Sequence, residues 1–274
     1  RGSMPTPAPD EYPPALFLTS QGGVEATELT RGPWSHGVMH GGPICGLMSW
    51  GIERELARAD LMCSRYTVEI LSGVPVDSLG ISANVVKNGK RTAVVEASIS
   101  HQGRVVARAT SQWLSRPKEL SGHQIPVPDF PVERADPGAH PDMEYPRPGF
   151  NADAVELRVV SGSTEESGPG LIWARLDHEL IAGEAASKFQ QVATLCDLGA
   201  AVGWEHDDND QAFINPDVTL QLLRLPQTEW ILFDSAVERS SPNLGCCRTT
   251  LADEAGVIGW VLQSQMVAPE EIRL

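Results

Sequence analysis

The sequence predicts an α+β protein built from two similar units, each with one long helix followed by an antiparallel sheet. An apolar run, Ile44 to Trp50, follows a glycine pair and precedes β-branched runs that are separated by tight turns. The same order of segments recurs in the second half of the chain, after a Pro-rich stretch. We therefore expect two units, residues 15–116 and 151–268, joined by a coil linker at residues 117–150.

The first unit is expected to open with a hairpin and a helix. Ala15 to Thr19 and Val24 to Leu29 flank a Gly-rich turn. His40-Gly41-Gly42-Pro43 then comes directly before the helical run. Two glycines at a helix start leave backbone N–H groups uncovered, and such groups can bind an anion or a developing oxyanion.

Four strands are expected to complete the first unit. Asn88-Gly89 predicts a two-residue hairpin turn, and Gln102-Gly103 predicts a second tight reversal. The strand-like runs are Tyr66 to Leu71, Ile81 to Val86, Thr92 to Ile99 and Val105 to Trp113.

The second unit repeats this pattern with little identity. A leading hairpin is expected from Val155 to Val160 and from Leu171 to Leu176, and a helix is expected from Glu184 to Val202. Thr67 to Leu71 can be aligned with Thr219 to Leu223. The strand-like runs after the helix are Val218 to Leu223, Trp230 to Val237, Cys246 to Leu251 and Val257 to Met266.

Composition excludes several classes of protein. The 274 residues are 41% hydrophobic, enough for a substantial core, and the net charge of −15 argues against nucleic acid as the main partner. We find no segment long and apolar enough for a membrane span and no apolar signal segment, so we expect a cytoplasmic location. The five cysteines lack CxxC spacing, which indicates reduced thiols rather than a disulfide framework or a zinc site.

Two landmarks, WSHGVMHGGPICGLM and INPDVTLQLLRLPQTEW, together with the doubled helix-and-strands pattern, resemble the thioesterase-like double-hotdog family, which includes acyl-CoA thioesterase II. The resemblance extends from about Ala15 to Val267. It implies two antiparallel sheets, each wrapped around a long central helix. It also implies hydrolysis of acyl-CoA substrates to a free acid and CoA by a carboxylate-activated water, with no metal or organic cofactor, and assembly into a homodimer.

The resemblance assigns roles to two residues. Asp217 begins the first strand after the second helix, where the family has its catalytic Asp. Gln263 lies on the last strand, where the family has a Gln that orients water. Gln265 shares the face of Gln263 by the period of two, so it stays an alternative.

The third family residue is a Thr hydroxyl on the intervening strand, and here the sequence departs from the pattern. Glu238 occupies the matching position. Three alternatives stay open: Ser240 or Ser241 supplies the hydroxyl, Glu238 acts as a second base, or the catalytic network is broken.

The first helix start and the second helix contribute further candidates. The resemblance implies that His40, Gly41 and Gly42 lie near the thioester, with His40 as a positioning group and the glycine N–H groups as an oxyanion site. Because Arg65 aligns with Asp217, a single composite site is expected. Asp197 is either an acid of the kind that single-hotdog thioesterases carry on the central helix or a helix-buried Asp with hydrogen bonds to its surroundings.

Two other functions compete with hydrolysis. A catalytically inactive acyl-CoA-binding or lipid-binding protein is consistent with Glu238 in place of a hydroxyl. A hydratase or dehydratase would need an Asp and a His in one helix–loop segment, and the sequence does not show that pair around Asp217.

Overall fold

The structure is a computed structural model that describes residues 12–33, 37–116, 125–126, 131–135, 148–162, 168–202, 213–241 and 243–267. Most of the predicted linker lies outside these ranges. The linker residues that are described include a short 3-10 helix, η3 (Val132–Arg134), whose Val132 packs against Trp173 and Leu232.

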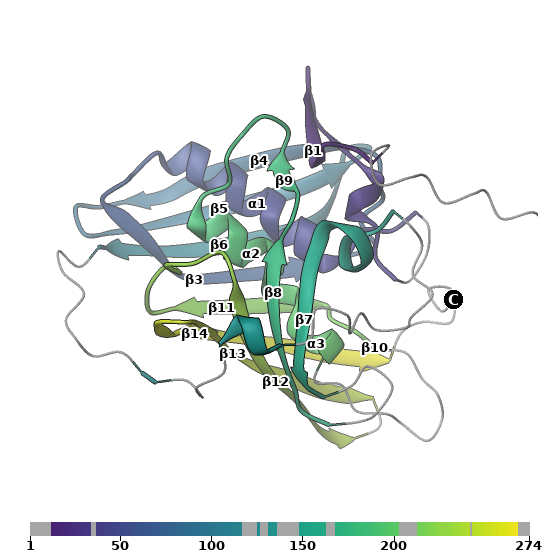
Figure 1. Ribbon diagram of the computed structural model, residues 1–274. Coiled ribbons are helices and arrows are strands. Elements are labelled where there is room, and N and C mark those ends of the chain that lie inside the picture. The colour runs from purple at the N-terminus through teal and green to yellow at the C-terminus, as the bar shows by residue number, and fades with distance from the viewer. Residues whose placement is uncertain are drawn as a thin grey trace, which may run out of the picture.

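The described residues of the first half form one long helix and six strands, whose arrangement is shown in Figure 1. The four strand runs predicted after the helix are confirmed, and the helix begins at the predicted glycine pair. The predicted run Val24 to Leu29 is a strand only as far as Ala26, because a 3-10 turn begins at Glu28. The elements are β1 (Ala15–Ser20), β2 (Gly23–Ala26), η2 (Glu28–Thr30), α1 (Gly41–Leu56), β3 (Leu61–Ile70), β4 (Ser78–Asn88), β5 (Thr92–His101) and β6 (Arg104–Ser115).

The second half has a comparable order with a different helical region. Its elements are η4 (Phe150–Ala154), β7 (Val155–Ser161), β8 (Gly170–Leu176), β9 (Glu179–Ile181), α2 (Lys188–Leu195), η5 (Cys196–Leu198), α3 (Gly199–Val202), β10 (Phe213–Ile214), β11 (Asp217–Leu222), β12 (Ile231–Ser241), β13 (Leu244–Asp253) and β14 (Gly256–Val267).

The single helix predicted from Glu184 to Val202 is wrong in its extent. A capping box between Ser187 and Gln190 starts α2 at Lys188. The α-helix gives way to the 3-10 turn η5 at Cys196. Gly199 then lies so close to β13 that a Cβ there would be 2.1 Å from Thr249 Oγ1, so packing against the sheet accompanies the break.

The described strands form one sheet of 14 strands rather than the two separate sheets that were expected. The order along it is β7-β8-β12-β13-β14-β11-β3-β6-β5-β4-β2-β1-β9, and β10 pairs with β14. The correction arises because β11 hydrogen-bonds directly to β3, so the strands of the two halves share one ladder.

The junction of β3 and β11 supports the internal repeat. Thr67 and Thr219, which the sequence alignment matched, lie directly opposite each other in this antiparallel pair, and their hydroxyl oxygens are 3.3 Å apart. The next segments also match, because Leu71 N–H donates to Val106 O and Leu223 N–H donates to Ile258 O. Matched residues that face each other in an antiparallel pair define an approximate twofold axis at this point.

One turn prediction is wrong and one is confirmed. Asn88 pairs with Ala93 and Gly89 N–H donates to Thr92 O, so the reversal lies at Lys90 and Arg91 rather than at Asn88 and Gly89. Gln102 and Gly103 have φ of 48° and 77° between the paired residues His101 and Arg104, as a tight two-residue reversal requires.

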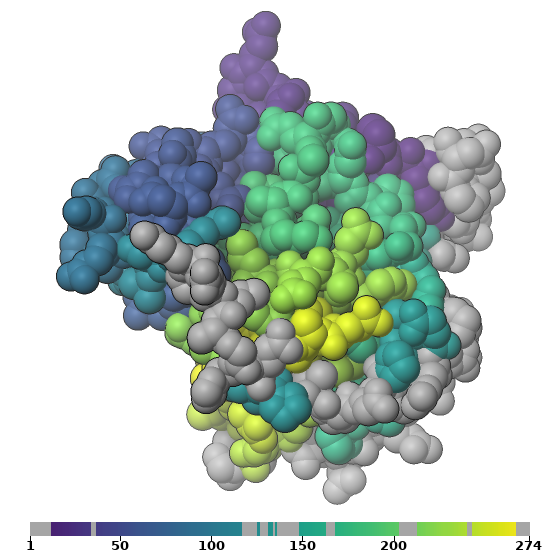
Figure 2. Space-filling view, turned by 60° about the vertical axis from the view of Figure 1, so that its left-hand side comes forward, coloured from purple at the N-terminus to yellow at the C-terminus, as the bar shows by residue number. Residues whose placement is uncertain are grey.

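Helices α1 and α2 lie side by side against the concave face of the sheet (Figure 1). Their close approach depends on Gly46, where a Cβ would be 2.3 Å from Thr194 Oγ1. The main apolar core combines residues of both halves, including Leu47 and Met48 of α1 and Phe189 and Val192 of α2. The surfaces of the halves adjoin, blue-to-teal beside green and yellow, in Figure 2. No helix in the described ranges is long and apolar enough to cross a membrane.

Candidate active site

A buried carboxyl–amide pair lies where η5 meets β14. Gln263 Nε2 donates to Asp197 Oδ1 over 2.7 Å and to the Asp197 backbone oxygen over 3.2 Å. Gln263 is fully buried, and Asp197 is 6% exposed. These two hydrogen bonds hold Asp197, on the central helical segment, against Gln263 on the last strand.

Three further groups surround the Asp197 carboxyl. Asn215 Nδ2 donates to Oδ1 over 3.3 Å, and the Gly41 backbone N–H also donates to the carboxyl. His40 Nδ1 lies 3.4 Å from Oδ2. These contacts bring the start of α1, in the first half, together with three segments of the second half.

Burial sets the protonation of the two titratable groups. It raises the pKa of the Asp197 carboxyl to about 7, although the hydrogen bonds from Asn215, Gln263 and Gly41 oppose this shift. Burial lowers the pKa of His40 to about 4. With these values the contact is a neutral pair between pH 4 and 7, and above pH 7 an anionic Asp197 lies beside a neutral imidazole.

His40 also caps α1. Its Nδ1 accepts a hydrogen bond of 3.0 Å from Gly42 N–H, so the proton of the neutral ring lies on Nε2. The ring stacks on Phe150 with a centroid distance of 4.9 Å. These contacts fix the orientation of the imidazole.

The expected oxyanion site at the two glycines needs correction. Gly41 N–H is bonded to Asp197, and Gly42 N–H is bonded to His40. Both donors are engaged because the side chains of the site itself cap the helix start. Gly41 is required for this approach, since a Cβ there would lie 2.4 Å from Asp197 Oδ2.

Asp217 does not lie with Gln263, contrary to the expectation. Asp217 lies on the same face of β11 as Thr219, two residues along the strand. Thr219 pairs with Leu262 of β14, which is 47% exposed, so this face points outward. Gln263 points to the opposite, buried face. The landmark Asn215-Pro216-Asp217 reaches the site through Asn215, and its Asp faces away because a strand alternates its side chains.

The other candidates on β12 also lie elsewhere or outside the described part. The Glu238 side chain is 77% exposed and lies 3.6 Å from Arg248, on the outer surface, so its departure from the family pattern does not touch the Asp197 site. The side chains of Ser240 and Ser241 lie outside the described residues.

Two buried hydroxyl groups that the sequence analysis did not single out lie beneath the break in the helical region. Ser235 of β12 and Thr249 of β13 are fully buried, and their oxygens are 2.9 Å apart. Both lie under Gly199, two residues after Asp197. The alternating pattern of each strand could have indicated these two residues, because it places both of them on the inner face.

The related position in the first half lacks this chemistry. The strand register makes Ser111 of β6 the counterpart of Gln263, and Ser111 donates to Val95 O. Aromatic rings in edge-to-face contact fill the surrounding space, and one of them donates to Ser111: Tyr66, Phe189 and Trp113.

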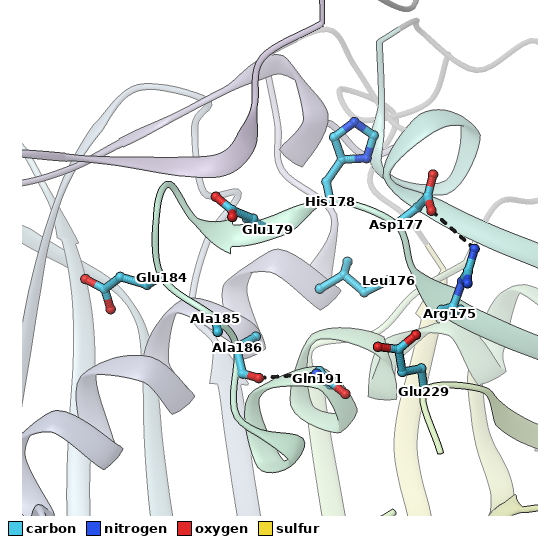
Figure 3. Close-up of a pocket in the computed structure, with 10 residues that line it drawn as sticks. All are labelled: Arg175, Leu176, Asp177, His178, Glu179, Glu184, Ala185, Ala186, Gln191 and Glu229. Carbon is cyan, nitrogen blue, oxygen red and sulfur yellow. Dashed lines mark hydrogen bonds and ion pairs between the residues drawn. The ribbon is translucent and has the colours of Figure 1, made fainter.

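A surface pocket of about 310 Å³ lies apart from the Asp197 site and shares no residue with it (Figure 3). Four carboxylates line it: Asp177, Glu179, Glu184 and Glu229. Its cation, Arg175, is paired with Glu156 and Asp177. An anionic ligand would be repelled there. Within the described part of the chain, no group of three or more His, Cys, Asp or Glu could hold a metal ion.

Comparisons with known proteins point to one family. A family model for the acyl-CoA thioesterase C-terminal domain matches residues 128–267, and a model for the acyl-CoA thioesterase N-terminal domain matches residues 30–113. No curated protein matches the chain in sequence.

Solved structures share the fold at low sequence identity. A hot dog protein of unknown function from Alicyclobacillus acidocaldarius has a TM-score of 0.70 at 16% identity, covering 92% of this chain and 96% of its own. A putative thioesterase from Novosphingobium aromaticivorans has a TM-score of 0.66 at 20% identity, covering 88% and 92%. The tesB protein of Mycobacterium avium subs paratuberculosis has a TM-score of 0.66 at 12% identity, covering 89% and 92%.

Proposed function

Because the chain belongs to the acyl-CoA thioesterase family, we propose that this thioester hydrolase cleaves acyl-CoA to a free acid and CoA with Asp197 as the base. The observation that carries the proposal is the Asp197–Gln263 pair: a buried carboxyl with a pKa of about 7, held by an amide over 2.7 Å. A base of this pKa is suited to proton transfer at neutral pH.

Gln263 has a second function in this proposal. Its Nε2 holds Asp197, and its buried Oε1 has no hydrogen-bond partner among the described residues. A water that donates one hydrogen to Oε1 and the other to the Asp197 carboxylate would have a lone pair free for the thioester carbonyl carbon. Asn215 holds the carboxylate from another side.

The reaction then follows in two steps. Asp197 takes a proton as the water oxygen bonds to the carbonyl carbon, which gives a tetrahedral intermediate. The carbon–sulfur bond breaks as the carbonyl re-forms, and the departing thiolate takes up the proton. The neutral His40 ring donates its Nε2–H to the developing oxyanion, because its Nδ1 is engaged by Gly42.

Two single substitutions, compared with each other, test the assignment of Asp197 as the base. Asp197→Asn keeps the size of the side chain and removes the base, so kcat for thiol release from acyl-CoA should fall by about 10²-fold or more. Asp217→Asn is the matched control and should keep kcat within about twofold. Loss of turnover in Asp217→Asn with full turnover in Asp197→Asn would overturn the assignment.

The same assay discriminates the competing functions. An acyl-CoA-binding protein would bind acyl-CoA saturably and release no thiol. A hydratase would need an Asp and a His, and the contact between His40 and Asp197 brings such a pair together from two segments. Hydration of an enoyl-CoA should therefore be measured in the same experiment as hydrolysis. Consumption of enoyl-CoA without thiol release would favour a hydratase.

We further propose that residues 15–116 and 151–268 are two hotdog units of a double hotdog, with residues 117–150 as the linker. The pairing of Thr67 with Thr219 and the matched bonds around it support two related units. A homodimer, a cytoplasmic location and the absence of a nucleic-acid partner stay predictions from the sequence.

A further inference from the structure

A second buried glutamine on β14 has no role in the proposed hydrolysis. Gln265 is 3% exposed and lies two residues beyond Gln263 on the same face of the strand. Its Oε1 has no hydrogen-bond partner among the residues that the structure describes. Burying an amide oxygen without a donor costs free energy, so such an atom in a buried polar site points to a ligand that supplies the donor.

The unpartnered acceptors gather at this end of the site. Asn215 Oδ1, Gln263 Oε1 and Gln265 Oε1 are all buried without a partner in the described ranges. The amide nitrogens of Asn215 and Gln263 already bond to Asp197. These three amide oxygens can only accept hydrogen bonds, so this part of the site suits a ligand that carries N–H or O–H groups.

Opposite Gln265 on the sheet lies a glycine, and the side chain of Arg239 packs over that glycine. The partner of Gln265 on β13 is Gly245, whereas the partner of Gln263 is Cys247. The Arg239 stem crosses Gly245, and its guanidinium lies 3.3 Å from the centre of the Phe213 ring. Gln265 thus lies between the Asp197 pair and a cationic group at the end of the strand.

The spacing of the two glutamines matches the thiol arm of the substrate. In CoA, the sulfur is followed by two methylenes and an amide N–H, so four covalent bonds separate the thioester carbon from that nitrogen. This reach is of the same order as the roughly 7 Å between Cα atoms two residues apart on a strand. If the thiol arm runs along β14 from a thioester carbon beside Gln263, its amide N–H comes within reach of Gln265.

We propose that Gln265 is a specificity-determining residue whose Oε1 accepts a hydrogen bond from the amide N–H next to the thioester sulfur. The inference rests on the proposed thioester hydrolysis and deepens it. Gln265 selects thioesters of pantetheine-type thiols over simple alkyl thioesters, because a site built to bind an N–H leaves its acceptor unpaired with an analogue that lacks one.

Four substrates with one acyl group test the selection. Acyl-N-acetylcysteamine carries the amide, and the acyl pentyl thioester replaces it with methylenes. Wild-type protein should show kcat/KM at least tenfold higher for the amide substrate, a comparison that needs no variant. Acyl-pantetheine and acyl-CoA share this amide, so any further gain for acyl-CoA measures recognition of the nucleotide separately.

Variants assign the selection to Gln265. Gln265→Leu should lower kcat/KM for the amide substrate about tenfold and leave the alkyl substrate unchanged, which brings the ratio near one. Gln265→Glu keeps an acceptor oxygen and should keep the preference. Gln221→Leu, on the exposed face of β11, is the matched control and should change neither value.

Each outcome has a separate meaning. Equal hydrolysis of both substrates by wild-type protein, or a preference that survives Gln265→Leu, overturns the role of Gln265 and leaves the hydrolase intact. No hydrolysis of any of the four thioesters overturns the proposed function and this inference with it. Gln265→Leu removes an unpaired buried oxygen, so we expect its melting temperature to be at least that of wild type.

Discussion

At the residue scale, burial distinguishes the two aspartates that the sequence offered as bases. Asp197 is 6% exposed, and burial raises its pKa to about 7. Asp217 begins β11 and points to the opposite face of the sheet from Gln263. Burial makes the Asp197 carboxylate a stronger base, because a desolvated carboxylate accepts a proton more readily. The chemistry therefore depends on where each carboxyl is buried.

The pH dependence of turnover follows from this value. Hydrolysis needs the Asp197 carboxylate, so kcat should rise with pH and reach half of its plateau near pH 7. Below that pH the protonated carboxyl cannot take a proton from water. Thiol release measured from pH 5 to pH 9 checks this, and Asp217→Asn should give the same midpoint. A midpoint near pH 4 would exclude Asp197 as the base.

The raised pKa of Asp197 makes stability depend on pH in the opposite direction to turnover. The pKa of Asp197 is raised from 3.8 to about 7 on folding, so the folded state keeps a proton that the unfolded chain loses, and stability falls as pH rises through this window. At pH 8 Asp197→Asn should therefore be more stable than wild type, by up to about 4 kcal/mol. Denaturant unfolding at pH 4.5 and pH 8 measures the gap, which should widen with pH. An unchanged gap would contradict the raised pKa.

At the element scale, the start of α1 and the break after α2 form one unit. The N-terminal turn of α1 uses His40 and Asp197 as its caps, so a helix from the first half is completed by a side chain of the second. The break at η5 turns Asp197 toward Gln263, and the Ser235–Thr249 pair lies beneath it. Changes in the helix start should therefore affect the carboxyl.

Gly41→Ala tests this coupling. The added Cβ would lie 2.4 Å from Asp197 Oδ2, so the carboxyl has to move away from its partners. Displacement of a reacting group by about 1 Å can cost about 10²-fold in rate, and we expect kcat to fall at least tenfold. Gly22→Ala is the control, because no atom lies within 4 Å of its added Cβ. Equal kcat in the two variants would show that the helix start does not position Asp197.

At the scale of the whole molecule, the two halves share a sheet, a core and a site. β3 pairs with β11, and β1 pairs in parallel with β9, so strands of both halves meet at two places. Glu53 of α1 accepts from Ser187 and Gln190 at the start of α2. Neither half can bury its apolar face without the other.

The halves should therefore unfold together. A calorimetric scan should show one transition with a van't Hoff enthalpy close to the calorimetric enthalpy. Leu220→Asp, which places a charge in the buried face beside the β3–β11 junction, should lower the midpoint of that single transition. Two resolved transitions in the wild-type protein would show that the halves are independent.

Local pattern determined much of this protein. Alternation of apolar residues predicted the strands, the glycine pair predicted the start of α1, and the period of two placed Gln263 and Gln265 on the same face of their strand. Cys246 is exposed and Cys247 is buried, because adjacent side chains on a strand point to opposite faces. These features depend on residues that are close together in the sequence, so they can be predicted from the sequence alone.

Only the tertiary structure decided which acid lies beside Gln263 and whether the sheets are separate. Asp197 and Gln263 are 66 residues apart, and their contact depends on a helix break that packing against β13 accompanies. The fused sheet depends likewise on the pairing of β3 with β11 across the two halves. Periodicity reports the face on which a side chain lies, whereas contacts between distant segments depend on how the faces pack together, and that is settled only when the whole chain has folded.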